Sequence, residues 1–243
     1  GIETNFHLLL YGPPGTGKTS LARYISVQTG LPLITARLDG MVSSLLGSTA
    51  KNIRKVFEYA SKRPCILFLD EFDVLAKVRD DKNELGELKR VVNSLIQNID
   101  SFSEDSIFIA ATNHSQLLDE AIWRRFSKVL KLDLPDEKLR KELLMEYSVL
   151  MENNYQDDSK KLKELVDATD SFSPADIKNV ITSTAKKTIL NEHTIMKYSQ
   201  IVYEIFLKRQ SNVGTIEGAV NYLVKHKVPQ RDISEVLNIS IRQ

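Results

Sequence analysis

Eight consecutive residues near the start of the chain have the types and spacing of a phosphate-binding loop. The segment Gly12–Thr19 reads Gly-Pro-Pro-Gly-Thr-Gly-Lys-Thr and matches the pattern G-x-x-x-x-G-K-[ST] at every position. Glycines let such a loop curl until successive amide hydrogens point into one concavity, where they attract an anion. Lys18 then reaches the β- and γ-phosphates of a nucleotide, and the Thr19 hydroxyl is a ligand suited to Mg²⁺. The predicted phosphate contacts are Gly12, Pro13, Pro14, Gly15, Thr16, Gly17, Lys18, Thr19 and Ser20.

The segments on either side of this loop support the interpretation. The apolar run Phe6–Tyr11 predicts a buried strand, and Ser20–Thr29 has the apolar spacing of a helix that stops at Gly30. The alternative is an ordinary Gly/Pro turn between a strand and a helix. The dinucleotide pattern G-x-G-x-x-G does not fit, because Ser20 occupies the position of its third glycine.

Two acids follow another apolar run. Asp70 and Glu71 come directly after Cys65–Leu69, which has no polar alternation and is therefore typical of a central parallel strand. In phosphoryl transfer, an aspartate at such a position holds the Mg²⁺ shell and a glutamate polarises the attacking water. Two solvated carboxylates at a strand end are the alternative. Asp73 either lends a supporting hydrogen bond or is an exposed acid at a helix start.

Three more polar residues complete the candidate site. Asn113 follows the apolar run Ser106–Ala111 and Thr112. Its side-chain amide either orients the attacking water or only stabilises the conformation of the turn. Arg124 and Arg125 close the helix that follows. An arginine pair at a helix end is either a solvated end favoured by the helix dipole or a positive charge for a phosphate bound to a neighbouring molecule.

The elements that must position these residues alternate between strand and helix over residues 1–134. This order is the signature of a parallel sheet with helical crossovers, so the first domain is predicted to be α/β. Strands are expected at Phe6–Tyr11, Leu33–Leu38, Cys65–Leu69, Ser106–Ala111 and Val129–Leu134. Helices are expected at Ser20–Thr29, after the N-cap Ser48, at Glu84–Ile99 and at Ser115–Phe126.

Beyond Pro135 the strand patterns stop and helical periodicity takes over. Residues 135–212 are therefore predicted to form an all-helical domain, and residues 213–243 a helical tail. The first helix is expected to bury Leu139, Leu143, Tyr147 and Leu150. Further helices are expected at Lys160–Ala168, from the N-cap Ser173 to about Leu190, and at Thr194–Gln210, Ile216–His226 and Gln230–Leu237.

The composition limits the classes of partner. The 243 residues include 33 Lys and Arg against 32 Asp and Glu, so a formal net charge of +1 favours neither nucleic acid nor an anionic membrane. The single cysteine, Cys65, excludes an intrachain disulfide and favours a reducing compartment. No apolar run approaches about 18 residues and no signal-peptide pattern is present, which predicts a cytoplasmic protein without a membrane span. The chain starts with Gly1 close to a core strand, so we expect it to be an excised fragment.

Four motifs in this order resemble the AAA family of ATPases. They are Gly12–Thr19, Cys65–Asp73, Ala110–Asn113 and Leu118–Phe126, and the last contains a run that looks most like the spastin and katanin branch. The resemblance covers residues 1 to about 210 and implies a P-loop NTPase fold with ATP and Mg²⁺ as cofactors. It implies that Lys18, Thr19 and Asp70 bind phosphate and metal, that Glu71 is the Walker B glutamate, that Asn113 is sensor 1, and that Arg124 and Arg125 are arginine fingers acting on the adjacent subunit.

The same resemblance implies that residues 135–210 form the family's helical lid. Where the family usually has Ser-Gly-Ala-Asp near the nucleotide, this chain has Ser173-Pro174-Ala175-Asp176. Ala175 is therefore a predicted nucleotide contact, and the proline in place of glycine is a departure that affects the approach of the backbone.

The family also implies a hexameric ring of identical subunits that remodels a protein substrate or binds an adaptor. Members that thread polypeptide usually place an aromatic, an aliphatic and a glycine after the second strand, whereas this chain has Leu45-Leu46-Gly47. The two leucines either line the pore of the ring without an aromatic grip or pack the loop against its own domain.

Two other functions compete with this one. Residues 216–243 resemble the start of a helix-turn-helix, which would suit a nucleic-acid-associated regulator, but four basic residues against three acids give this tail a net charge of only +1. Binding of nucleic acid is therefore not expected, and a helical packing or docking tail is the simpler interpretation. A small-molecule kinase would use the same loop but would leave Glu71, Asn113 and the arginine pair without a joint purpose.

Overall fold

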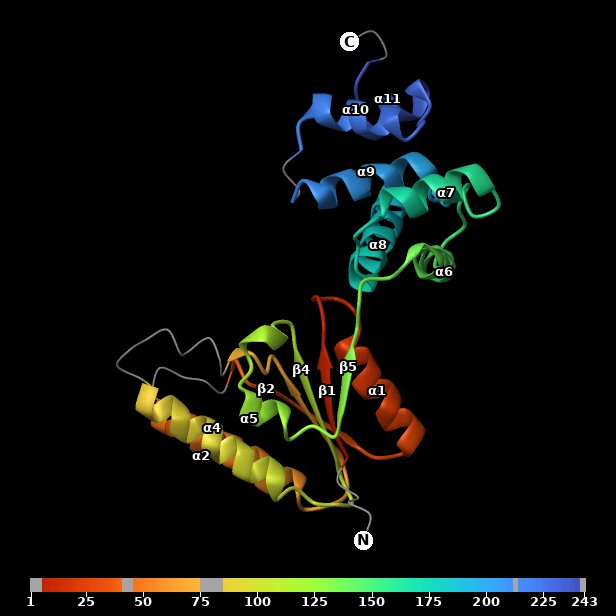
Figure 1. Ribbon diagram of the computed structural model, residues 1–243. Coiled ribbons are helices and arrows are strands. Elements are labelled where there is room, and N and C mark those ends of the chain that lie inside the picture. Colours follow the sequence, from red (N-terminus) through yellow and green to blue (C-terminus); the bar gives the residue numbers. More distant parts are fainter. Residues whose placement is uncertain (1–5, 41–45, 75–84, 212–213, 241–243) are drawn as a thin grey trace. The chain divides into compact units, whose positions relative to one another are not determined.

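The computed structural model describes residues 6–40, 46–74, 85–211 and 214–240. The chain divides into two compact units, Gly1–Asp133 and Leu134–Gln243 (Figure 1). The first is a sheet with helices, and the described part of the second consists of helices and one isolated β-bridge. Assigning these units to nucleotide binding, lid and tail remains a proposal.

Among its described residues, the first unit is built on five parallel strands. They are β1 (Phe6–Tyr11), β2 (Leu33–Arg37), β3 (Ile66–Asp70), β4 (Ile107–Thr112) and β5 (Lys128–Lys131), in the order β2-β3-β4-β1-β5. They are connected through α1 (Lys18–Thr29), α2 (Leu46–Ala60), α4 (Leu85–Asp100) and α5 (Glu120–Trp123). The predicted α/β fold with a parallel sheet is therefore confirmed.

Helices cover both faces of the sheet because side chains alternate along each strand. Leu67 and Phe108 belong to a buried cluster that also contains Leu95 of α4. Their sequence neighbours Phe68 and Ile109 point to the opposite face and join a cluster that includes residues of α1. Because the central strands are covered on both sides, they are apolar throughout, as the sequence predicted.

The carboxyl ends of β1, β3 and β4 meet at one edge of the sheet (Figure 1). Tyr11 pairs in register with Thr112, and Leu69 pairs with Ala110. The phosphate-binding loop follows β1, the acid pair closes β3 and Asn113 follows β4. Parallel pairing therefore brings three motifs that are far apart in sequence to the same edge, which is where open α/β sheets bind ligands.

The described part of the second unit is helical. Its helices are α6 (Glu137–Ser148), α7 (Ser159–Ala168), α8 (Pro174–Leu190), α9 (Tyr198–Arg209), α10 (Ile216–Lys225) and α11 (Gln230–Leu237). The expected start of α8 is confirmed, because Ser173 Oγ accepts the Asp176 amide at 3.2 Å and an Asp176 carboxylate oxygen accepts the Ser173 amide at 3.1 Å. Leu223 and Ile233 of the tail share one buried cluster with Ile201 of α9. This packing favours a helical packing role for the tail.

Several predicted helix boundaries were wrong. The helix expected at Ser115–Phe126 is interrupted: Ser115–Leu117 is a short 3₁₀ turn, and α5 starts at Glu120 because Leu118 and Asp119 have extended backbone. Helix α2 begins at Leu46, so Ser48 lies inside it rather than at its N-cap.

In the helical unit, the predicted start of one helix was wrong and the predicted buried face of another was wrong in part. Helix α9 starts at Tyr198 rather than Thr194, because the preceding Met196 forms a bridge with Asn153. In α6, Leu143 and Tyr147 are half-buried and pack against the core as predicted, whereas Leu139 is 43% and Leu150 is 65% exposed. The buried positions of this helix are Arg140, Leu144 and Ser148. The buried stripe contains an arginine and a serine, and an apolar pattern cannot identify such a stripe.

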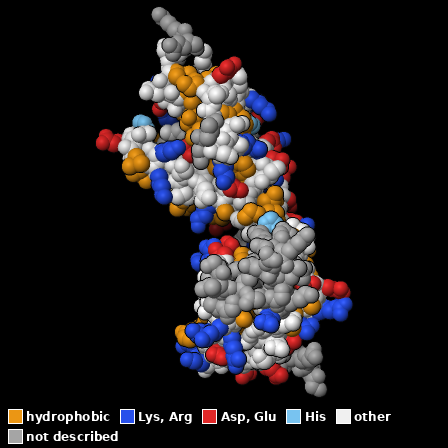
Figure 2. Space-filling model, turned by 90° about the vertical axis from the view of Figure 1, so that its left-hand side faces the viewer, with side chains coloured by type: hydrophobic (Ala, Val, Ile, Leu, Met, Phe, Trp, Pro, Cys, Tyr) orange, Lys and Arg blue, Asp and Glu red, His pale blue; other side chains and the backbone are white. Residues whose placement is uncertain are grey.

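The surface carries charges of both signs. Figure 2 shows basic and acidic side chains interspersed on the visible face of the helical unit, without one continuous basic area there. This mixture is consistent with the near-zero net charge of the whole chain. Over the described residues, none of the helices combines the length and the apolar character needed to cross a membrane.

Candidate nucleotide-binding and hydrolysis site

The phosphate-binding loop depends on its glycines. The φ angle is 146° at Gly12, 78° at Gly15 and 99° at Gly17, values that residues with a side chain rarely adopt. A Cβ at Gly12 would also lie 2.0 Å from the carbonyl oxygen of Leu132. Gly17 is the N-cap of α1 and offers no side-chain oxygen to the first turn. The amides of that turn can therefore face an anion, as the phosphate prediction requires.

Lys18 is buried within the loop. Its Nζ donates to the carbonyl oxygens of Gly12 at 2.7 Å and Pro13 at 2.8 Å. Burial lowers the pKa of Lys18, and the negative charges of Asp70 and Asp73 oppose that shift. The phosphate oxygens of a nucleotide can replace these two carbonyl oxygens as partners of the ammonium group.

Thr19 and Asp70 come together although 51 residues separate them. The Thr19 hydroxyl donates to Asp70 Oδ2 at 3.2 Å, and Asp70 Oδ1 accepts the amide of Glu71 at 2.9 Å. A hydroxyl and a carboxylate are hard oxygen ligands of the kind that Mg²⁺ prefers. The donor set at this position thus fits the magnesium site predicted from the sequence.

Glu71 is held by a residue that the sequence analysis missed. Its Oε1 accepts from Arg37 Nη2 at 2.9 Å, and its φ of 56° places a non-glycine residue in the left-handed region. Arg37 also donates to Asp39 at 2.8 and 3.2 Å, and this hydrogen bonding raises the pKa of the Arg37 guanidinium. Arg37 ends β2 in register with Asp70. A polar residue at the end of a strand was therefore the signal that could have identified it.

Asn113 follows β4 and is half-buried. The preceding Thr112 donates its hydroxyl hydrogen to Asp73 Oδ1 at 3.0 Å and accepts the His114 amide at 3.0 Å. Asp73 is 2% exposed, so the interpretation of this residue as an exposed acid at a helix start is wrong. The structure thus places Asn113 in a loop that is anchored to the acid-bearing end of β3.

The two arginines have different environments. The Arg124 side chain is 69% exposed and pairs with Glu120 at 2.5 Å. Arg125 is more buried and pairs with Asp100 at the end of α4 at 2.9 Å. The carbonyl oxygen of Arg125 also accepts a hydrogen bond from His7 Nδ1 at 2.9 Å, if that nitrogen carries the proton. Within the described residues, each guanidinium thus has an ion-pair partner outside the phosphate-binding loop.

Three further predictions concern residues that belong to the second unit or whose side chains are not described. Ala175 is half-buried in α8 of the second unit, and its contact with nucleotide stays a prediction. Leu45 and the side chain of Leu46 lie outside the described residues. Their assignment to a pore therefore also stays a prediction.

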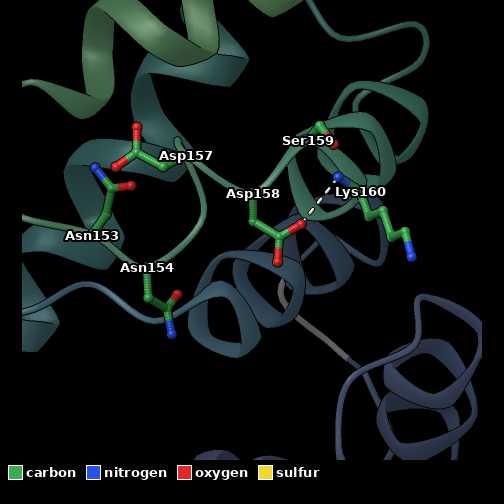
Figure 3. A pocket seen from close by; sticks show the side chains of 6 residues that line it. All are labelled: Asn153, Asn154, Asp157, Asp158, Ser159 and Lys160. Atoms are coloured by element: carbon green, nitrogen blue, oxygen red, sulfur yellow. Dashed lines mark hydrogen bonds between the residues drawn. The ribbon is translucent and has the colours of Figure 1, made fainter.

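A polar depression in the second unit does not resemble a second site. Its side chains stabilise their own loop, since Asn153 Nδ2 donates to Gln156 Oε1 at 2.8 Å. Asp158 Oδ1 accepts the Lys160 amide at 3.0 Å (Figure 3). Asp158 is the N-cap of α7, which accounts for its position. The residues lining the depression are Asn153, Asn154, Asp157, Asp158, Ser159 and Lys160.

Comparison with known proteins gives a consistent result. Residues 8–134 match the ATPase family associated with various cellular activities (AAA). The chain is 52% identical over 136 residues to an uncharacterized AAA family ATPase, y4kL, of Sinorhizobium fredii, a match that covers 56% of this chain and 41% of that protein. It is 33% identical over 219 residues to the proteasome-activating nucleotidase of Saccharolobus solfataricus, covering 86% of this chain and 55% of the relative.

A third relative is the ATP-dependent zinc metalloprotease FtsH of Alkalihalophilus pseudofirmus, which is 36% identical over 209 residues, covering 83% of this chain and 30% of that protein. The chain thus spans roughly half or less of the length of these relatives, from 30% to 55%. The family match covers the phosphate-binding loop, the acid pair, Asn113 and the arginine pair. With the geometry of that site, it shows that the chain belongs to the AAA family of ATPases.

Proposed function

We propose that the chain is the Mg²⁺-dependent ATPase module of a ring-forming protein that remodels protein substrates. The observation that carries the chemistry is the contact between the Thr19 hydroxyl and the Asp70 carboxylate beside the phosphate-binding loop. These two residues would hold the metal, and Lys18 would bind the phosphates. Bound Mg²⁺ supplies positive charge that offsets the phosphate charge.

Within this proposal, Glu71 is the general base that takes a proton from the attacking water. To do so it must leave Arg37, which holds its carboxylate at 2.9 Å in the structure described here. Asn113 orients the same water by hydrogen bonding, and together the two residues favour in-line attack on the γ-phosphate. These roles explain why a carboxylate and an amide follow neighbouring strands.

Arg124 and Arg125 complete the proposal as donors of positive charge to the site of an adjacent subunit. The exposed guanidinium of Arg124 is the better placed of the two to reach another molecule. A positive charge is needed where charge develops on the transferred phosphoryl group. The site is then complete only in an oligomer, and we propose a homohexameric ring.

The protein substrate is inferred from the relatives. One of them is named as an activator of the proteasome and another as an ATP-dependent protease, and their matches cover 86% and 83% of this chain. We propose that this chain likewise acts on a protein substrate or adaptor, in the cytoplasm. Its place in the spastin and katanin branch, the contact of Ala175 with nucleotide and a pore lined by Leu45 and Leu46 are further parts of this proposal.

Subunit mixing tests the ring directly. Lys18→Ala should weaken ATP binding but leave the arginines intact, whereas the double variant Arg124→Ala/Arg125→Ala should keep ATP binding and lack the arginines. Each alone should be inactive, and mixtures should regain ATPase activity at junctions where an intact site meets intact arginines. Sedimentation with ATP, with and without EDTA, measures whether a hexamer forms and whether the metal is required. Inactive mixtures that co-sediment as one assembly would contradict arginine donation between subunits.

A further inference from the structure

Thr112 lies where three motifs of the site meet. Its hydroxyl donates to Asp73 Oδ1 and accepts from the His114 amide, both at 3.0 Å. Its carbonyl oxygen accepts the amide of Gly12, the first residue of the phosphate-binding loop, at 3.4 Å. Thr112 is 1% and Asp73 is 2% exposed, so water does not compete freely for these bonds.

The directions of these hydrogen bonds follow from the groups involved. The His114 amide can only donate, so the Thr112 oxygen is its acceptor. The Thr112 hydroxyl hydrogen is then directed to the carboxylate of Asp73, which accepts it. The His114 amide donates, the Asp73 carboxylate accepts, and the Thr112 hydroxyl does both. A buried group that lost its partner would lower the stability of the fold. The hydroxyl therefore has one defined orientation.

Asn113 is the residue between the two anchored positions. The Thr112 hydroxyl accepts the His114 amide and donates to Asp73, which follows the end of β3. Nearby, the Phe72 amide donates to the Ala111 carbonyl oxygen at 2.9 Å, which fixes the turn that follows Glu71. The backbone that carries Asn113 is thus linked to the backbone that carries the acid pair.

We infer that Asp73 and Thr112 are positioning residues that hold Asn113 in register with Glu71 and the phosphate-binding loop. The inference rests on the proposed role of Asn113 in orienting water. Neither positioning residue touches the reacting atoms in this account. A small displacement of Asn113 then lowers the rate of hydrolysis and leaves the affinity for nucleotide almost unchanged, because Lys18 and the loop amides do not move.

The test uses two substitutions at one position. Thr112→Val keeps the shape and the β-branch but removes the hydroxyl, whereas Thr112→Ser keeps the hydroxyl and is the matched control. We expect Thr112→Val to lower kcat at least about tenfold with KM and the ATP dissociation constant changed less than about threefold, and Thr112→Ser to stay within about threefold of wild type. Thr112→Ala replaces Thr112→Val if the valine variant does not fold, as judged by thermal melts.

Amide hydrogen exchange gives a readout that does not depend on activity. The His114 amide should exchange at least about tenfold faster in Thr112→Val than in wild type or Thr112→Ser, because its acceptor is gone. Asp73→Ala should lower kcat as Thr112→Val does, and the two losses of kcat should not add in the double variant, because both substitutions remove the hydrogen bond between Thr112 and Asp73. Unchanged exchange, or equal damage from valine and serine, overturns the inference.

A double variant separates this inference from the function on which it rests. In an Asn113→Ala background, which should itself lose at least about tenfold in kcat, Thr112→Val should cause no further loss. Wild-type kcat in Asn113→Ala refutes the role of Asn113 and the inference with it. Loss of kcat in Asn113→Ala together with wild-type kcat in Thr112→Val refutes the positioning alone. If the losses of kcat from Asn113→Ala and Thr112→Val add and the melting temperature falls, Thr112 has a purely structural role and the inference is overturned.

Discussion

Replacement of Lys18 by methionine should weaken ATP binding without unfolding the sheet. The ammonium group of Lys18 has two carbonyl partners, at 2.7 and 2.8 Å, so nucleotide binding exchanges these contacts for phosphate contacts. A hydrogen bond to a charged group contributes about 1.5–3 kcal/mol net. We expect the phosphate contacts of Lys18 to be more favourable than its carbonyl contacts by about this free energy, which Lys18→Met removes. Since about 1.4 kcal/mol corresponds to a factor of ten, the dissociation constant for ATP should rise about 10- to 100-fold.

Calorimetric titration with a slowly hydrolysed ATP analogue measures this change. Lys62→Met, which replaces an exposed lysine of the same unit, is the matched control and should bind like wild type. A thermal melt of each variant separates lost affinity from lost folding. Unchanged affinity in a folded Lys18→Met protein would refute the assignment of this lysine to the phosphates.

Three further predictions concern the arginine pair, Gly12 and the pH dependence of stability at His226. Arg124→Ala and Arg125→Ala should each leave the ATP dissociation constant within about threefold and lower kcat at least about tenfold, and unchanged kcat in steady-state assays would contradict the proposed roles. Gly12→Ala should abolish nucleotide binding, because the new Cβ would lie 2.0 Å from the Leu132 carbonyl oxygen, and calorimetry showing wild-type binding would contradict that reasoning. Burial lowers the pKa of His226, so the unfolded chain binds this proton more readily and stability should fall as pH drops below about 6.5. Thermal melts at pH 7.5 and 5.5 should show a smaller loss in His226→Gln, and an equal loss would contradict it.

The parallel sheet and the acid pair could be predicted because their signals are local. An uninterrupted apolar strand, a glycine-rich loop and a strand-terminal acid each specify one element, and parallel pairing then brings the strand ends together. The contact of Thr19 with Asp70 is the direct result. No knowledge of long-range packing was needed to expect it.

The missed features depend on contacts between distant residues. Arg37 was not identified because its importance comes from Glu71, 34 residues away in the sequence. The sequence left Asp73 undecided between a supporting hydrogen bond and an exposed acid, because its partner Thr112 reads as an ordinary strand residue. In α6, the buried Arg140 donates to the carbonyl oxygens of Pro135 and Val166, which makes a polar position part of the interior.

Helix boundaries failed for a similar reason. The region after Asn113 has helical spacing, but the extended backbone at Leu118 and Asp119 divides it into a short turn and α5. Apolar periodicity reports which side chains face the core and does not report such a local change of backbone conformation. The arginine pair nevertheless closes α5, as expected from the sequence.

The most direct test of the account is a comparison of ATP binding and hydrolysis in Glu71→Gln. Glutamine keeps the size of the side chain but cannot accept the proton of the attacking water. With Glu58→Gln as the exposed control, calorimetry and single-turnover hydrolysis should be measured on the same assembled protein. The account predicts an ATP dissociation constant within about threefold of wild type and a hydrolysis rate at least about tenfold lower. Hydrolysis at the wild-type rate in Glu71→Gln would contradict the central claim that this carboxylate is the base.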